Sequence, residues 1–287
     1  MRTLPRPPFS TEDVLLDCIS NYRDPDLHIR FLSSKEEIVE WSEILENKIK
    51  AHTVSTIESD KCIPQNISKS EMIKLYNDKF SKKGQPGRLY YNDIMDLPKY
   101  RLCPLCGYRP VDSLDHYLPK DLFPALSIIP INLIPACFPC NKRKQTSRPS
   151  SAEEEFLHPY FDNIEDKLWL YSEVLEELPL TVVFKVQPHN EWDEITSKRV
   201  KYHFKKFHLG QQFSSYAGNE LSGKIFRLKE SFDQGGSSVV RDELLKEKES
   251  YRFSKLNSWE TALYSALYDS NWFCEEALKH SISELLG

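Results

Sequence analysis

Four of the seven cysteines form two Cys-x2-Cys pairs, which are separated by thirty residues near the middle of the chain. The pairs are Cys103 with Cys106 and Cys137 with Cys140. Two such pairs can close one tetrahedral site, and in an intracellular protein this spacing favours zinc over disulfides. We therefore expect a structural Zn²⁺ ion to staple this segment into a compact unit. The other three cysteines are isolated and are expected to lie buried as small hydrophobic residues: Cys18, Cys62 and Cys274.

The segment that carries the cysteine pairs is basic, whereas the chain as a whole is acidic. From Lys99 to Pro149 there are eight Lys and Arg residues against three Asp residues, a formal charge of +5. The whole chain carries −5, so the remainder carries −10. This balance argues against a protein that coats nucleic acid by bulk attraction. The basic segment instead marks one place where an anion could dock.

Composition predicts a folded, soluble protein. Hydrophobic residues make up 40% of the 287 residues, which is enough apolar material for a core. No stretch approaches the ~18 consecutive apolar residues of a membrane helix, and the first ten residues lack the apolar region of a secretory signal. We expect a cytoplasmic protein with no membrane partner. No Gly-rich phosphate-binding loop is present, and the sequence does not indicate an oligomeric state.

The expected fold class is α+β, mainly α, with a central zinc-stapled module and a small β-hairpin. Three regions follow one another: an N-terminal helical region over 1–98, the cysteine module over 99–150, and a mostly helical region over 151–287 with a hairpin near 168–186. In the first region, capping-box patterns that begin at Ser10, Ser34 and Ser68 predict helix starts. A loop is expected over 82–88 and a short helix over 90–95.

The third region contains further local signals. Two runs rich in branched and aromatic residues, 168–174 and 180–186, predict the hairpin, and residues 235–238 are expected to form a flexible joint. His158 has Pro, Tyr and Phe neighbours, which favour packing over metal binding. A basic run is best interpreted as a solvated helix face, although it could extend a nucleic-acid surface: Lys198, Arg199, Lys201, Lys205 and Lys206.

The cysteine module also contains polar residues that a purely structural zinc ribbon does not need. Asp115 and His116 begin an Asp-His-x-x-Pro phrase, Asn132 lies in the centre, and Asn141 belongs to a closing Cys-Asn-x-x-Lys phrase. In this order the phrases resemble the motif of HNH endonucleases, the ββα-metal or His-Me finger family, in its four-cysteine zinc variant. The likeness covers about 45 of the 287 residues. Two flanking stretches resemble, more weakly, a group of bacterial HNH proteins, namely Gly84-Gln85-Pro86 upstream and residues 158–162 downstream. Some of those proteins act in anti-phage defence.

The resemblance implies a β-hairpin that carries Asp115 and His116, and a following helix that brings Asn141 beside Asp115. His116 would act as the general base, because histidine titrates near neutrality. Asp115 and the side-chain oxygen of Asn141 would hold Mg²⁺ or Mn²⁺, since hard cations prefer oxygen ligands and neutralise a scissile phosphate. Asn132 would brace the loop that orients His116.

Three basic residues are candidate contacts to backbone phosphates, namely Lys144, Lys120 and Arg143. For the last two, a solvated surface position is the favoured interpretation. Each catalytic candidate also has a simpler alternative. The histidine could be a satisfied core residue, Asp115 an ordinary strand-end carboxylate, and Asn141 the N-cap of the helix that follows the second cysteine pair.

The expected function is metal-dependent hydrolysis of DNA in bacterial anti-phage defence. Double-stranded DNA is the favoured substrate. One module holds one active site, so nicking of a single strand is the expected elementary step. Three alternatives stay open: a nuclease subunit gated by an ATPase partner, a zinc-dependent DNA-binding module without catalysis, and an enzyme that cleaves RNA.

Overall fold

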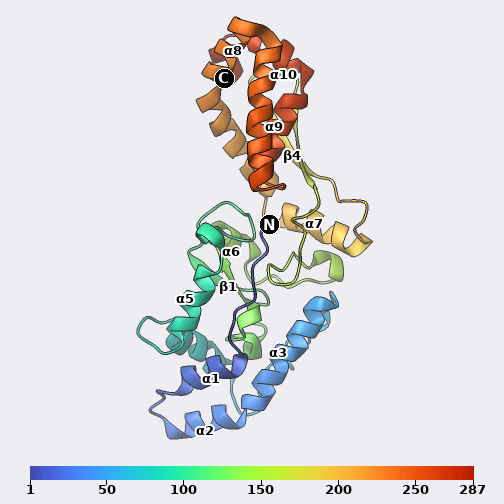
Figure 1. Cartoon of the computed structure of the whole chain (residues 1–287). Helices are drawn as coiled ribbons and strands as arrows, with labels where there is room; N and C mark the ends of the chain where they lie inside the picture. Colours follow the sequence, from blue (N-terminus) through green and yellow to red (C-terminus); the bar gives the residue numbers. More distant parts are fainter. The chain divides into compact units, whose positions relative to one another are not determined.

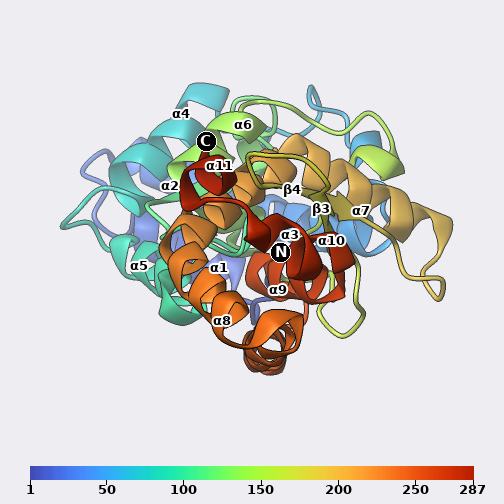
Figure 2. The same cartoon turned by 90° about the horizontal axis from the view of Figure 1, so that it is seen from above.

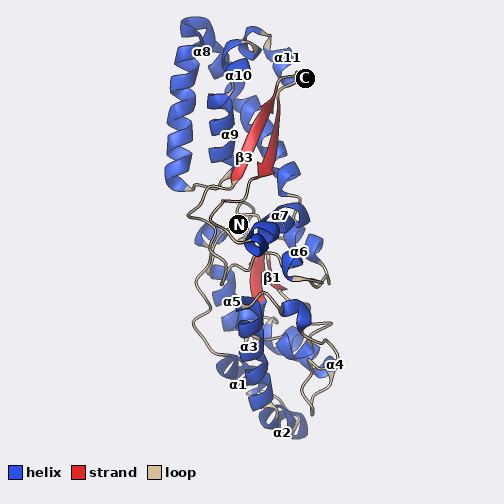
Figure 3. Ribbon diagram, turned by 90° about the vertical axis from the view of Figure 1, so that its right-hand side faces the viewer, coloured by secondary structure: helices blue, strands red, loops and turns tan.

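The computed structural model describes all 287 residues, and the chain folds into two compact units, Met1–Asn163 and Ile164–Gly287. Helices predominate, and each unit contains one two-stranded antiparallel sheet (Figures 1 and 3). This confirms the expected α+β class with mainly helical content. The N-terminal helices and the cysteine pairs belong to the same unit, which continues to Asn163. None of the helices combines the length and the apolar composition that crossing a bilayer would require.

Five α-helices precede the cysteine pairs in the first unit: α1 (Thr11–Ile19), α2 (Pro25–Ser33), α3 (Lys35–Lys50), α4 (Lys69–Lys74) and α5 (Arg88–Asp96). The predicted capping boxes at Ser10 and Ser68 are both formed. The helix start predicted at Ser34 is confirmed, because Ser34 is the N-cap of α3, but the capping box itself is not formed, since the Ser34 side chain makes no capping hydrogen bond. Ser34 directly follows α2 and its amide bonds to Arg30 of that helix, so its backbone is already committed to closing α2.

The cysteine pairs enclose a short strand pair that a helix follows. Strands β1 (Ser113–His116) and β2 (Leu133–Ala136) are antiparallel, with Asp115 opposite Ile134 and His116 opposite Leu133. Helix α6 (Phe138–Lys144) starts immediately after Cys137. All four residues of β2 are buried. The catalytic candidates therefore stand on elements that are anchored in the core of the first unit.

The second unit begins with the predicted hairpin, which is confirmed as β3 (Leu170–Leu175) paired with β4 (Thr181–Val186). Five helices follow: α7 (Glu194–Lys206), α8 (Leu209–Ser254), α9 (Trp259–Asp269), α10 (Asn271–Glu275) and α11 (Ile282–Leu286). At Gly236 the backbone has φ 68° and ψ −162°, which interrupts α8 within the joint expected over 235–238. The two arms of α8 face each other, since Lys224 pairs with Glu247 at 2.8 Å (Figure 2).

Burial corrects one expectation about α7 and confirms another about the isolated cysteines. Lys198, Lys201 and Lys205 are exposed, but Arg199 and His203 are each only 1% exposed. The interpretation of the whole basic run as a solvated face was therefore wrong for Arg199. The three isolated cysteines have no exposed surface, as expected: Cys18, Cys62 and Cys274.

Candidate active site and metal centre

The four paired cysteines gather in one buried cluster. Their Sγ atoms all lie within 4.8 Å of one another, and none of them forms a disulfide. The Sγ atoms of Cys106 and Cys137, one from each pair, are 3.9 Å apart. Zinc–sulfur bonds of about 2.3 Å in a tetrahedron separate the sulfurs by roughly 3.8 Å. The cluster therefore has the composition and the spacing that a four-coordinate metal such as zinc requires.

Two different local structures present the two pairs. The first pair sits in a tight loop, where Cys103 N donates to Arg109 O and Gly107 N donates to Cys103 O, both at 2.7 Å. Gly107 has φ 75°, a conformation that glycine adopts without strain. The second pair stands on the first turn of α6, where Asn141 N donates to Cys137 O. A metal bound to both pairs would tie this helix to the loop.

The protonation of the cluster also favours a cation. Burial raises the pKa of the Cys103 thiol above its usual value. A hydrogen bond from Cys103, together with those from the other two cysteines, lowers the pKa of Cys106. Four thiolates at this distance would repel one another, so without a cation some of the sulfurs stay protonated. A bound divalent metal takes the place of those protons.

A second group of predicted residues surrounds a separate cavity of about 250 Å³. The cavity is lined by Asp115 and His116 from β1, by Asn141 and Lys144 from α6, and by Lys120 from the loop after β1. Five of the seven predicted catalytic and phosphate-contacting residues therefore meet at one place. The other two, Asn132 and Arg143, do not line this cavity.

His116 is fixed in one orientation at the end of β1. Its Nε2 lies 2.9 Å from the carbonyl oxygen of Ser127, which can only accept, so Nε2 carries the ring proton. The edge of the ring packs against Tyr76, with centroids 4.5 Å apart. Burial lowers the pKa of His116 to about 3. At neutral pH the ring is therefore uncharged, and its Nδ1 keeps a lone pair.

Asn132 connects both ends of the segment that leads from His116 to β2. Its Oδ1 accepts from Leu118 N at 2.8 Å, and its Nδ2 donates to the carbonyl oxygens of Leu118 and Leu126, both at 3.0 Å. The side chain is completely buried. Ser127, which fixes the His116 ring, directly follows Leu126. Asn132 thus acts on the position of His116 through the backbone and not through contact with the cavity.

Asp115 and Lys144 form a buried ion pair. The Lys144 Nζ lies 3.3 Å from Asp115 Oδ1, and the exposed fractions of the two side chains are 1% and 9%. Burial raises the pKa of Asp115, while the nearby charge of Lys144 opposes that shift. Lys144 is thus not a surface cation, and it would meet a phosphate only inside the cavity.

Asn141 stands in the interior of α6, so its interpretation as an N-cap was wrong. The N-cap is Cys137, and the first free amide, Phe138 N, donates to the side chain of Asp112 at 2.7 Å. Asn141 Nδ2 donates to Ser113 Oγ at 3.1 Å, which leaves its Oδ1 available. Asp112 was not singled out from the sequence, although a carboxylate near a helix start is a familiar signal.

Tyr76 is a cavity residue that sequence reasoning missed, as is the charged Asp121. Tyr76 belongs to a π-helical turn, Leu75–Phe80, that continues α4, and burial raises its pKa. Its ring contacts His116 on one side, and the Lys120 Nζ lies 5.3 Å from its centroid. No local pattern links this residue to a histidine forty positions further along the chain.

His158 is a packing residue, as expected. Its Nε2 lies 3.0 Å from Ile131 O and its Nδ1 accepts from Tyr160 N at 3.2 Å, so both ring nitrogens are engaged. The ring is completely buried against that of Tyr117, with centroids 4.4 Å apart. Neither nitrogen is available to a metal.

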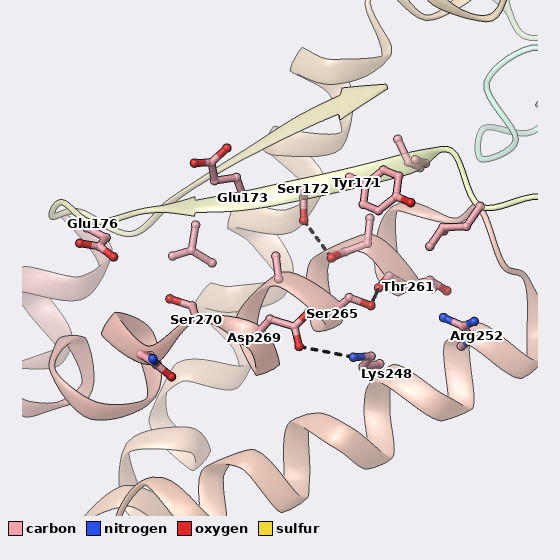
Figure 4. Close-up of a pocket in the computed structure, with 16 residues that line it drawn as sticks. Tyr171, Ser172, Glu173, Glu176, Lys248, Arg252, Thr261, Ser265, Asp269 and Ser270 are labelled. Atoms are coloured by element: carbon pink, nitrogen blue, oxygen red, sulfur yellow. Dashed lines mark hydrogen bonds and ion pairs between the residues drawn. The ribbon is translucent and has the colours of Figure 1, made fainter. Parts of the chain in front are cut away.

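A larger cavity, of about 540 Å³, is formed by residues of the second unit alone, between β3, α8 and α9 (Figure 4). Several of its polar groups already have partners. Lys248 lies 3.6 Å from Asp269, and Ser172 donates to the backbone of Ala262 at 2.9 Å. Ser265 donates to Thr261 O. The cavity has no cluster of metal ligands and no nucleophile with an adjacent base, so the smaller cavity is the candidate site.

Comparison with known proteins adds one likeness. No family model matches the chain, and no solved structure matches it. Protein ea31 of Escherichia phage lambda is 29% identical over 173 residues, which is 59% of this chain. The match spans 58% of the length of that phage protein. The name of this relative states no activity, so a function has to be argued from the chemistry of the site.

Proposed function

We propose that this chain is a metal-dependent endonuclease of the HNH type, which hydrolyses phosphodiester bonds in DNA. The observation that carries the proposal is the state of His116. It is a neutral imidazole whose proton is held on Nε2 by Ser127 O, and it lines a cavity shared with Asp115 and Asn141. A general base needs a free lone pair at the operating pH and a fixed orientation. His116 has both.

In the proposed reaction, Nδ1 of His116 takes a proton from a water molecule as the water oxygen attacks phosphorus. The bond between phosphorus and the 3′ oxygen breaks, and the leaving 3′ oxygen takes a proton from solvent. Asn132 bonds to Leu118 and to Leu126, the residue before Ser127, and so helps to hold the base in place at the cavity. The products are a 5′ phosphate and a 3′ hydroxyl.

The oxygen atoms beside His116 are those that a hard divalent cation prefers. Asp115 offers a buried carboxylate, and Asn141 offers an Oδ1 with no hydrogen-bond partner. These two residues would hold Mg²⁺ or Mn²⁺, which would neutralise charge on the scissile phosphate when bound. Asp115 and Asn141 supply only part of the ligands that such a cation needs. Oxygen atoms of the substrate and of water would complete its coordination.

Zinc has a separate, structural role in the proposal. Cys103, Cys106, Cys137 and Cys140 would hold it and tie the start of α6 to the preceding loop. Because Asn141 and Lys144 stand on the same short helix, this tie would also set their positions over β1. Loss of zinc would then disturb the cavity without removing any residue from it.

Cationic side chains at the cavity offer contacts to the phosphates of a polyanion such as DNA. Lys120 and Lys144 line it, beside Asp115 and Asp121, and Arg143 belongs to the last turn of α6. With a single cavity of this kind, one binding event would cut one strand. By resemblance to bacterial HNH proteins, the cellular role that we propose is defence against phage. A host that expresses the chain should then lose protection, seen as plaque number, when Asp115→Asn is introduced.

The test uses purified, zinc-loaded protein and a supercoiled plasmid with Mg²⁺ or Mn²⁺. We expect relaxed circles to appear, EDTA to stop the reaction, and Asp115→Asn to be inactive although folded. A DNA ligase should reseal the nicks, because the proposed cleavage leaves a 5′ phosphate beside a 3′ hydroxyl. An RNA of the same sequence should be cut more slowly. Equal cleavage in EDTA would contradict the proposal.

A further inference from the structure

The proposed catalytic site already contains a cation of its own. The Lys144 ammonium lies 3.3 Å from Asp115 Oδ1, and the lysine side chain is 1% exposed. A lysine is seldom buried so completely, because removing its charge from water is costly unless an anion compensates it. In the free protein, Asp115 therefore neutralises Lys144. The same carboxylate is the proposed ligand of the divalent cation.

The backbone around Lys144 is held by local hydrogen bonds at the end of α6. Lys144 is the last residue of α6, and its carbonyl accepts from both the amide and the hydroxyl of Ser147. The next residue, Gln145, has φ 51°, so the helix ends in a tight turn. Asn141 lies one turn earlier on the same helix and lines the same cavity. Lys144 lines this cavity of about 250 Å³, so its ammonium group can meet a phosphate bound there.

Two cations cannot share Asp115 without repulsion. A divalent ion on this carboxylate would stand next to an ammonium group at low exposure, where charges interact strongly. Lys120 and Asp121 also line the cavity and offset each other, so a bound divalent ion would give the cavity an excess of positive charge. A phosphodiester that enters the cavity brings negative charge that offsets this excess. It could accept from Lys144 and leave Asp115 to the ion.

We propose that Lys144 is a positioning residue that makes binding of the divalent cation depend on binding of the DNA phosphate. It pairs with Asp115 in the free protein and transfers to the phosphate when the DNA backbone enters. This inference rests on the proposed function. By linkage, the DNA and the ion then each increase the affinity for the other by the same factor, and typical couplings are about 5–150-fold.

The test measures binding of Mn²⁺ by electron paramagnetic resonance, not cleavage. All proteins carry His116→Ala, which prevents cleavage and leaves Asp115, Asn141 and Lys144 in place. Mn²⁺ is titrated into zinc-loaded protein with and without a DNA duplex of twenty base pairs, and binding to the duplex alone is subtracted. We expect the duplex to tighten Mn²⁺ binding by about 10–100-fold. Asp115→Asn should abolish the site under both conditions.

Lys144→Met removes the charge but keeps most of the side-chain length. We expect it to tighten Mn²⁺ binding to the free protein by about tenfold and to reduce the effect of the duplex to about threefold or less. Lys142→Met is the matched control, since Lys142 is exposed on the same helix. It should leave both affinities close to those of the parent.

The outcomes separate this inference from the function on which it rests. If Mn²⁺ binds at Asp115 equally well with and without the duplex, the coupling is wrong and the metal site stands. The same conclusion follows if Lys144→Met behaves like Lys142→Met. If Mn²⁺ does not bind, or binds unchanged to Asp115→Asn, the proposed catalytic site itself is wrong. Should Lys144→Met fail to fold, Lys144→Gln, which also removes the charge, gives the same comparison with and without the duplex.

Discussion

The Nε2 of His116 donates to the carbonyl oxygen of Ser127 over 2.9 Å, and this contact fixes the tautomer of a buried ring. A carbonyl oxygen has no proton to give, so the lone pair of the neutral imidazole is left on Nδ1. The partner is a backbone atom, and a side-chain substitution at position 127 does not remove it. The environment of the ring therefore determines its chemical state.

The buried position of His116 predicts the pH dependence of cleavage. Burial lowers its pKa to about 3, so the base stays deprotonated as the pH falls through the range where exposed histidines titrate. We expect the acidic limb of kcat/KM for plasmid nicking to lie below about pH 5. Single-turnover rates between pH 4 and pH 8 measure this. An acidic limb centred near pH 6.5 would contradict the lowered pKa that burial gives to His116.

Asn132→Ala tests the hydrogen bonds by which Asn132 holds the loop that positions His116. The substitution removes three buried hydrogen bonds and leaves both the amide and the carbonyl oxygen of Leu118 without these partners, whereas Leu126 O still accepts from Ile129 N. We expect the free energy of unfolding to fall by about 2–4 kcal/mol, because unsatisfied buried groups bear the cost of desolvation. Urea unfolding gives the value. Where the variant is still folded, kcat should fall more than the affinity for DNA. A loss below about 0.5 kcal/mol would refute this role.

Cys103→Ser tests the metal centre. The variant should lose bound zinc, measured by atomic absorption, together with part of its helical circular dichroism, since a structural zinc site contributes directly to folding. Cys62→Ser is the matched control, because Cys62 is equally buried but lies outside the cluster. It should keep a full complement of zinc. Normal zinc content in Cys103→Ser would exclude the four-cysteine site.

An ion pair away from both centres predicts how stability changes with pH. The Arg30 guanidinium bonds to the carboxylate of Glu71 at 2.6 Å and lowers the pKa of Glu71 to about 2. A lowered carboxylate pKa stabilises the fold above the ordinary value of 4.5, and this contribution is lost as the pH falls from 4.5 towards 2.

Glu71→Gln should therefore cost about 1–2 kcal/mol at pH 7, allowing for partial exposure, and clearly less at pH 3. Thermal unfolding of both proteins at the two pH values checks this. Glu58→Gln, which breaks the exposed pair between Glu58 and Lys61, should have little effect at either pH. An equal loss for Glu71→Gln at pH 3 and pH 7 would contradict the role of the charge.

Patterns that depend on local spacing were predictable from the sequence. The cysteine pairs converge, and Asp115, His116 and Asn141 share a cavity, because a short strand pair and a helix suffice to bring them together. The hairpin of the second unit also followed from its branched residues and its central proline. In each case the residues lie within a few tens of positions of one another.

Other features depended on tertiary packing, which no local pattern encodes. Tyr76 reaches His116 from a distant π-helical turn. The burial of Lys144 follows from where α6 ends over β1, whereas a lysine in a basic run is typical of a surface. The capping box at Ser34 failed because two helices compete for one residue. Sequence spacing identified the chemical groups, and packing determined which of them face one another.

The most direct test of the central claim compares His116→Ala with the parent protein in the plasmid assay, with Mg²⁺ present. His28→Ala is the control, because it makes the same substitution at a partly exposed position of α2 in the same unit. Zinc content and circular dichroism should be equal in all three proteins. We predict that nicking disappears in His116→Ala and persists in His28→Ala. Full nicking activity in a folded, zinc-loaded His116→Ala protein would contradict the assignment of His116 as the base.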